Sequence, residues 1–190
     1  MVSPLFSGAG ARATRAVPSA RLFIALWPDA STQDALHAEA ARFAALGRRL
    51  SARNLHVTLA FLGNVPLRRV EAITGLMRDA GPAACEFTLE HFGYFAQSGV
   101  LWAAPVATPV AVAAYQQRLT AALGAAGLRV EKRAFRLHVS LLRDAARPAP
   151  EQLNVPLNIP WRVRDIALVG SEPAAGGSRY VVLSRVPAPG

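Results

Sequence analysis

Several things that would hold a protein together or place it in a membrane are scarce in this sequence. Cys85 is the only cysteine among 190 residues, which excludes an intramolecular disulfide and a zinc site built from paired cysteines. Charged residues make up 17% and hydrophobic residues 52%, a balance that excludes bulk disorder. No run of about 18 apolar residues occurs, so the sequence predicts no transmembrane helix. We therefore expect a globular, monomeric protein of the cytoplasm that makes no contact with a membrane.

Acidic side chains are also scarce. Twelve acidic residues face 21 basic ones, which gives a net charge of +9, and every basic residue except Lys132 is arginine. Such an excess indicates a partner rich in phosphate, such as RNA or a nucleotide. The preference for arginine over lysine has a second explanation, because GC-rich codons enrich arginine together with alanine, glycine and proline. The excess of base over acid is harder to explain in that way.

The chain divides into an extension and a single domain. Residues 1–20 show no sustained hydrophobic period, and we expect a disordered N-terminal extension, with a misassigned start codon or a transit peptide as alternatives. We expect residues 21–190 to form one domain with two lobes. The hydrophobic pattern predicts strands and helices in an irregular order, which favours an α+β fold over a doubly wound parallel sheet. The expected strands are 21–27, 55–63, 86–94, 100–104, 135–142, 162–171 and 179–186, and the expected helices are 29–46, 66–80 and 110–126.

The same unit occurs twice in this order. A strand, a helix and a strand that contains histidine fill residues 21–62, and the same three elements fill residues 100–143. Two similar units in one small chain predict two lobes related by approximate two-fold symmetry.

Each histidine strand carries a hydroxyl two residues later. The first reads His56-Val57-Thr58 and the second His138-Val139-Ser140. Because strand side chains alternate between faces, each histidine shares a face with its hydroxyl, while the apolar residues between them face the core. We expect Phe61 on that core face as well.

This pattern suits phosphodiester chemistry. Opening a phosphodiester requires a base for the nucleophile and an acid for the leaving oxygen, and imidazole serves both roles near neutral pH. The hydroxyls of Thr58 and Ser140 can donate to phosphate oxygens, and Arg143 can neutralise charge that develops at phosphorus. A lone histidine on a strand is usually structural, but two matched copies are less easily dismissed. His37 and His91 are poorly placed for zinc, so we expect no metal site.

The motifs resemble those of the 2H phosphoesterase superfamily and, within it, the RNA 2′,3′-cyclic phosphodiesterases, also called 2′-5′ RNA ligases. The similar phrases are RLFIAL, NLHVTLAFLGNV, VLWA, AFRLHVSLLRDA and SRYVVL. The resemblance implies a bilobal α+β fold of mostly antiparallel sheet, with outer helices and a central cleft. It also implies hydrolysis of RNA 2′,3′-cyclic phosphate ends to 2′-phosphomonoesters without a cofactor or metal, and reversible 2′-5′ ligation without ATP.

The resemblance also assigns residues. His56 and His138 match the catalytic histidines, Thr58 and Ser140 the phosphate-binding hydroxyls, and Arg143 the arginine after the second motif. We favour His138 as the base and His56 as the acid. Ser140 replaces a commoner threonine and so lacks the stiffness of a β-branched side chain.

Two other functions stay open at this stage. The substrate could be a small cyclic nucleotide or a cyclic phosphate from tRNA splicing, or the chain could be a basic RNA-binding module without catalysis. Tyr94 and Phe95 are the aromatic residues we expect to reach a ligand. Further arginines near the two motifs could hold an RNA backbone or could simply be solvated; these are Arg48, Arg49, Arg53, Arg133 and Arg136.

Overall fold

The computed structural model describes residues 18–82, 84–131, 133–174 and 177–189. Most of the expected extension, residues 1–17, and Gly176 of the expected last turn lie outside the described residues. The first strand begins at Ser19, two residues before its expected start. No helix in the described part of the chain is long and apolar enough to cross a membrane.

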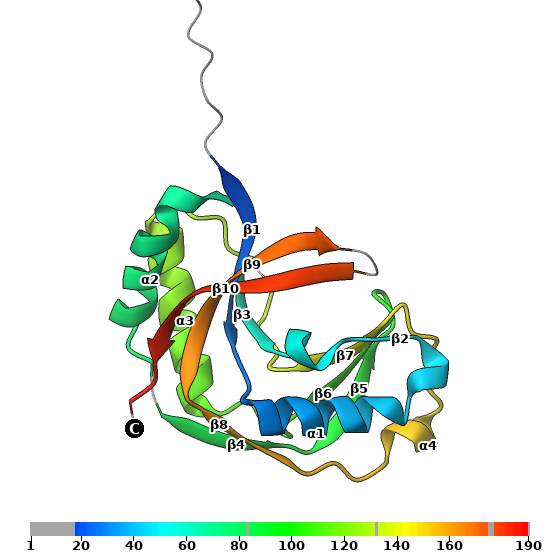
Figure 1. The fold of residues 1–190 in the computed structure, drawn as a ribbon. Helices are drawn as coiled ribbons and strands as arrows, with labels where there is room; N and C mark the ends of the chain where they lie inside the picture. The colour runs from blue at the N-terminus through cyan, green and yellow to red at the C-terminus, as the bar shows by residue number, and fades with distance from the viewer. Residues whose placement is uncertain (1–17, 83, 132, 175–176, 190) are drawn as a thin grey trace, which may run out of the picture.

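Ten strands and four α-helices alternate irregularly along the described chain (Figure 1). The strands are β1 (Ser19–Leu26), β2 (Arg48–Arg49), β3 (Val57–Pro66), β4 (Cys85–Leu89), β5 (His91–Phe95), β6 (Val100–Ala104), β7 (Val139–Arg143), β8 (Ile159–Val163), β9 (Asp165–Ala174) and β10 (Gly177–Pro187). The helices are α1 (Ala30–Ala41), α2 (Val70–Asp79), α3 (Val110–Ala125) and α4 (Pro150–Leu153), with single 3-10 turns at Ala44–Leu46, Ala52–Asn54 and Leu67–Arg69.

Local sequence signals explain where several elements begin and end. The carboxylate of Asp29 accepts a hydrogen bond from the backbone N–H of Thr32 at 3.0 Å, so it caps the N-terminus of α1. Gly127 follows α3 with a φ of +72°, a left-handed conformation that stops the helix and favours glycine. The helix that we expect over residues 29–46 is shorter in the structure. α1 ends at Ala41, and a separate 3-10 turn follows at Ala44–Leu46.

The main sheet consists of two halves. Its strand order is β10-β9-β1-β3-β7-β6-β5, with β2 paired to β7, and every pairing in it is antiparallel. We call β10-β9-β1-β3 the first half and β7-β6-β5 with β2 the second half. The two halves meet where β3 pairs with β7 at Val57 and Val139. The α+β class and the mostly antiparallel sheet are therefore confirmed.

A second, two-stranded sheet corrects one prediction. The expected strand 86–94 is in fact two strands, because β4 pairs with β8 while β5 pairs with β6 in the main sheet. The expected strand 135–142 begins only at Val139, and the expected loop 145–160 contains the short helix α4.

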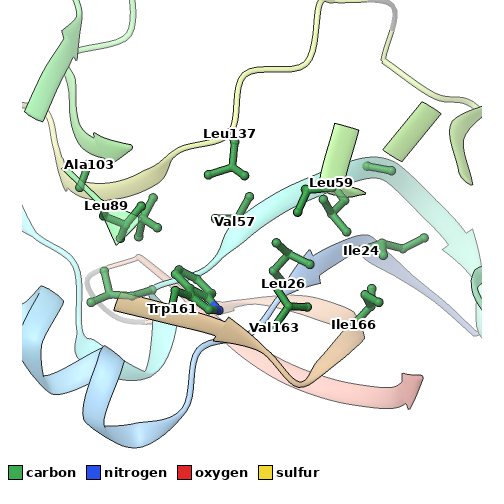
Figure 2. Packing of buried hydrophobic residues seen from close by; sticks show 14 of the residues in the cluster. Ile24, Leu26, Val57, Leu59, Leu89, Ala103, Leu137, Trp161, Val163 and Ile166 are labelled. Atoms are coloured by element: carbon green, nitrogen blue, oxygen red, sulfur yellow. The ribbon is translucent and has the colours of Figure 1, made fainter. Parts of the chain in front are cut away.

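The helices cross between the halves. α1 follows β1 of the first half but packs against β7 of the second half and against β8, whereas α3 follows β6 of the second half and packs against β3 and α2. The core lies between these helices, the two-stranded sheet and one face of the main sheet. Figure 2 shows Trp161 of β8 and Val57 of β3 within it, and Trp161 is only 1% exposed.

Candidate active site

The seam between the two halves brings the two motifs together. Val57 and Val139 are paired, and both are fully buried in the core. Their chain neighbours lie on the opposite face, where this antiparallel register places His56 beside Ser140 and Thr58 beside His138. All four of these side chains are partly exposed. The expected shared face of two histidines and two hydroxyls is therefore present.

Both imidazoles are held in the same way. The Nδ1 atom of His56 lies 2.7 Å from the carbonyl oxygen of Asn54, and that of His138 lies 2.7 Å from the carbonyl oxygen of Arg136. Since a carbonyl only accepts, each Nδ1 carries the hydrogen and donates it. The Nε2 atom of each neutral ring is thus left as an acceptor that can take up a proton. In the first motif, Nε2 of His56 lies 3.1 Å from the hydroxyl of Thr58.

Burial weakens the basicity of both rings. Loss of hydration lowers the pKa of His56 from 6.5 to about 4, and the charges of Arg143 and His138 lower it further, against the hydrogen bond to Asn54 that raises it. Burial is also the largest cause that lowers the pKa of His138, followed among the lowering causes by Arg133, Arg136 and Arg143. Both histidines are therefore neutral near pH 7 in the free protein, and an anion bound between them would favour their protonated forms.

Aromatic rings surround each histidine. His56 packs against Phe23, Trp27 and Tyr180, with ring centroids 4.8, 5.5 and 5.3 Å away, and the Trp27 ring is nearly parallel to it. Phe23 and Tyr180 belong to a small apolar cluster on this face of the first half. These rings fix the imidazole and exclude water from one side of it. The sequence pattern around His56 does not indicate these rings, because they come from β1, the residue after it and β10, far from the motif in the chain.

The second half has its own aromatic support. His138 packs against Phe95 at 5.0 Å and Trp102 at 6.3 Å. Trp102 is the direct neighbour of Ser140 on one side and of Gly93 on the other. A Cβ atom at Gly93 would overlap the indole of Trp102, so the ring lies over a position that only glycine can occupy. Alternation along β6 is the signal that places Trp102 on this face.

A cavity of about 570 Å³ opens mainly over the first half of the sheet and reaches β2 and β7 of the second half. His56, Thr58 and Arg143 line it, whereas His138 and Ser140 lie beside it on the adjoining strand and are not among its lining residues. Four arginines line its wall, namely Arg21, Arg48, Arg49 and Arg143. Arg48 also forms an ion pair with Asp144 at 3.1 Å. The cavity is thus suited to an anion, and it lies off-centre with respect to the two motifs.

Phe61 corrects one expectation about the faces of the strand. Its side chain is 38% exposed and lines the cavity instead of packing in the core. The reason is a β-bulge in β3, where Ile24 pairs with Ala60 but the next residue of β1, Ala25, pairs with Thr58. The extra residue, Leu59, shifts the alternation by one, so Phe61 shares the face of Thr58.

Some of the remaining ligand candidates lie at the site, whereas others are bonded elsewhere in the fold. Arg48 and Arg49 line the cavity, and Phe95 packs against His138. Tyr94 is engaged in the fold, since its hydroxyl donates to the carbonyl of Ala145 at 2.7 Å. Arg133 forms an ion pair with Glu131 at 2.8 Å. Within the described ranges, no three side chains among histidine, cysteine, aspartate and glutamate form a group that could hold a metal ion.

Comparison with known proteins identifies the family of the chain. The sequence pattern of the 2′-5′ RNA ligase superfamily matches residues 28–173. The RNA 2′,3′-cyclic phosphodiesterase of Escherichia coli (strain K12) is 31% identical over 170 residues, which cover 87% of this chain and 94% of that protein.

Solved structures show the same fold. The crystal structure of E. coli LigT complexed with 3′-AMP matches with a TM-score of 0.81 and 28% identity, over 90% of this chain and 99% of that one. The crystal structure of TT0787 of Thermus thermophilus matches with a TM-score of 0.73 and 26% identity, over 88% and 97% of the two chains. The chain belongs to the 2′-5′ RNA ligase superfamily and is a hydrolase of phosphodiester bonds.

Proposed function

We propose that the protein hydrolyses the 2′,3′-cyclic phosphate at an RNA end to a 2′-phosphomonoester, using His56 and His138 as a general acid and base without a metal ion. The observation that carries this proposal is the matched pair of imidazoles. Each donates through Nδ1 to a backbone carbonyl at 2.7 Å, and each is thereby left with Nε2 as its proton-transferring atom. Two proton-transfer groups on one face of adjoining strands are what an in-line displacement at phosphorus requires.

The two imidazoles and one water molecule account for every proton and bond in the reaction. One neutral imidazole takes a proton from water as the water oxygen bonds to phosphorus. The bond between phosphorus and O3′ breaks, and the other imidazole, in its protonated form, gives its proton to O3′. We assign the base to His138 and the acid to His56. The low pKa of His56 in the free protein means that the bound phosphate anion must supply the charge that keeps this acid protonated.

The other site residues hold the phosphate. Thr58 and Ser140 pair across the seam with the histidines of the opposite motifs, and the Thr58 hydroxyl also lies 3.1 Å from Nε2 of His56. Both hydroxyls can donate to the non-bridging oxygens. Arg143 lines the cavity, and its charge acts on both imidazoles, so it is close enough to both to stabilise negative charge that develops between them. The same steps with a 5′-hydroxyl attacking in place of water would form a 2′-5′ linkage as the bond between phosphorus and O3′ breaks, which is ATP-independent ligation. Their reversal would cleave that linkage and form the cyclic phosphate again.

The test is an RNA oligonucleotide that ends in a 2′,3′-cyclic phosphate, incubated with the protein in EDTA. We expect a 2′-phosphate product, and loss of turnover by about 10²–10⁴-fold in His56→Ala and in His138→Ala. His37→Gln is the matched control, since His37 lies on α1 and its Nδ1 bonds to the carbonyl of Leu50 at 3.2 Å. A 3′-phosphate product, or turnover that EDTA abolishes, would contradict the proposal.

The alternative substrates and the non-catalytic alternative are decided by the same assay. Turnover of small 2′,3′-cyclic nucleotides alone, with no turnover of the oligonucleotide, would identify a nucleotide phosphodiesterase. Binding of the oligonucleotide without turnover, unchanged in both alanine variants, would identify an RNA-binding module.

A further inference from the structure

Asn54 makes hydrogen bonds in two directions. Its backbone carbonyl accepts from Nδ1 of His56 at 2.7 Å, and its side-chain amide donates through Nδ2 to the backbone carbonyl of Ser178 at 2.9 Å. Ser178 belongs to β10, whose hairpin with β9 forms one wall of the cavity. The proposed chemistry does not use this amide, although it joins the first imidazole to a distant strand.

The strand pairing of β10 supplies no donor to the Ser178 carbonyl. Ser178 is paired with Pro173 of β9, which has no N–H, and β10 lies at the edge of the main sheet in the described part of the chain. A backbone carbonyl without a partner in the sheet is satisfied by a side chain or by water. The amide of Asn54 takes this place, so it ties the 3-10 turn before β3 to β10.

β10 holds His56 at a second point as well. Tyr180 follows Ser178 by two residues and therefore shares its face of the strand. The Tyr180 ring lies edge-on to the imidazole of His56, with centroids 5.3 Å apart and an angle of 84° between the planes. His56 is thus held by β10 directly through Tyr180 and indirectly through Asn54. If Asn54 moved away from β10, its own carbonyl would move away from Nδ1 of His56.

The second motif lacks this connection in the described part of the chain. Arg136 stands where Asn54 stands in the first motif, and its carbonyl accepts from Nδ1 of His138 at the same distance of 2.7 Å. The side chain of Arg136 is exposed and forms no hydrogen bond within the described ranges. The Nδ1 bond can therefore form without a tether, so the amide of Asn54 strengthens the hold on His56 and does not create it.

We propose that Asn54 is a positioning residue, which ties the turn before β3 to β10 and thereby keeps the His56 ring oriented with its hydrogen on Nδ1. This inference rests on the proposed function, because it takes the role of Nε2 in proton transfer from it. The bond that one ring nitrogen makes sets which nitrogen carries the proton, so a fixed carbonyl leaves Nε2 free to exchange a proton with the substrate. The wall of the cavity and the orientation of His56 are thus linked through one side chain.

A double-mutant cycle tests whether Asn54 acts through His56. Turnover of the oligonucleotide with a 2′,3′-cyclic phosphate end is measured for wild type, Asn54→Ala, His56→Ala and the double variant. We expect Asn54→Ala to lower kcat about tenfold and to leave KM within about twofold, because the amide orients the imidazole and does not hold the phosphate. In the His56→Ala background the same substitution should cause no further loss. An equal loss in both backgrounds, or a rise in KM alone, would overturn the proposal.

Nuclear magnetic resonance gives a second measurement that needs no turnover. The nitrogen chemical shifts of the neutral His56 ring report which nitrogen carries the hydrogen. We expect the hydrogen on Nδ1 in the wild type and a mixture of both tautomers in Asn54→Ala. An unchanged tautomer in Asn54→Ala would overturn the proposal. If the wild-type protein turned over neither the oligonucleotide nor small cyclic nucleotides, the proposed function would fail, while the tautomer would still decide whether Asn54 positions His56.

The matched control removes a side-chain amide elsewhere on the surface. Oε1 of Gln152 accepts from the backbone N–H of Ala149 at 2.8 Å, at the start of α4 and outside the lining of the cavity. Gln152→Ala should therefore leave kcat, KM and the His56 tautomer unchanged. A change in Gln152→Ala as large as that in Asn54→Ala would show that loss of any surface amide bond disturbs the site, which would also overturn the proposal.

Discussion

The two halves of the main sheet hold the same motif in different surroundings. Each half fixes its histidine through a carbonyl two residues earlier, at the same distance of 2.7 Å. In the first half three aromatic rings pack against His56 and the cavity opens beside it, while in the second half two rings pack against His138, outside the cavity lining. Duplication thus supplies two imidazoles that are held in the same way, and their neighbours make them different. The predictions below test how far that difference extends.

The largest effect should separate the acid from the base. In a substrate with sulfur in place of the bridging O3′, the leaving thiolate needs no proton, because thiols have a pKa of about 8.5. We expect His56→Ala to lose about 10³-fold in rate on the oxygen substrate and little on the sulfur substrate, whereas His138→Ala should lose a similar factor on both. Initial rates of product release measure this. Recovery in His138→Ala instead would reverse the assignment.

A second effect concerns stability at acid pH. The pKa of His56 is about 4 in the folded protein and 6.5 as the ordinary value, so between these pH values the unfolded chain binds more protons. Above pH 6.5 the imidazole of His56 is neutral in both states, and its contribution to the free energy of unfolding is fully present. As the pH falls from 6.5 towards 4, the unfolded chain takes up a proton that folding must remove, so the free energy of unfolding falls by about 3 kcal/mol. Urea unfolding of wild type and His56→Gln from pH 7 to 4 measures it, and the wild type should lose more stability than the variant.

His138→Gln extends this comparison to the second half of the sheet. Burial also lowers the pKa of His138, so this substitution should flatten the pH dependence in the same direction. If both variants kept the slope of the wild type, burial would not govern either imidazole.

A third effect concerns the second half alone. Gly93→Ala places a methyl group where the Trp102 indole lies, so the ring must move, and we expect a loss of about 1–3 kcal/mol in the free energy of unfolding. Gly75→Ala on α2 is the matched control, because its methyl would meet no atom within 4 Å and alanine favours a helix by about 0.5–1 kcal/mol. Equal stability of the two variants in urea would show that Trp102 does not need the space over Gly93.

The smallest effect should come from making the two motifs identical. Ser140→Thr keeps the hydroxyl and adds one methyl group beside Trp102, so we expect catalytic rates within about threefold of wild type. Ser140→Ala removes the hydroxyl and should cost about tenfold or more in kcat/KM, as expected for a hydrogen bond to a charged group. A large loss in Ser140→Thr would mean that the second motif depends on the small size of serine.

The shared face of the two motifs could be predicted from the sequence because it depends on a local pattern. The pattern His-x-Thr/Ser on a strand fixes which side chains share a face, and that face is present for His56, Thr58, His138 and Ser140. Repetition of the unit also indicated that the two motifs would meet. Such inferences need only the alternation of a strand and the comparison of two segments.

What could not be predicted depends on pairing between distant segments. The bulge in β3 arises from its register with β1, and it carries Phe61 from the expected core to the cavity. Tyr180 reaches His56 only because the hairpin of β9 and β10 joins the same sheet. Likewise, the separation of β4 from β5 follows from the pairing of β4 with β8. Local patterns contain no information about such registers.

The crossing of the helices between the two halves of the sheet has a consequence for how the protein folds. Since α1 packs on β7 and α3 on β3, a fragment that carried only one repeat would expose the apolar back of its own histidine strand. Neither repeat is therefore a self-sufficient module, and long-range contacts must form before either strand is covered. During synthesis, the site cannot be completed before β7 has emerged. Proteolytic nicking between the repeats should leave the two pieces associated, because each piece completes the core of the other.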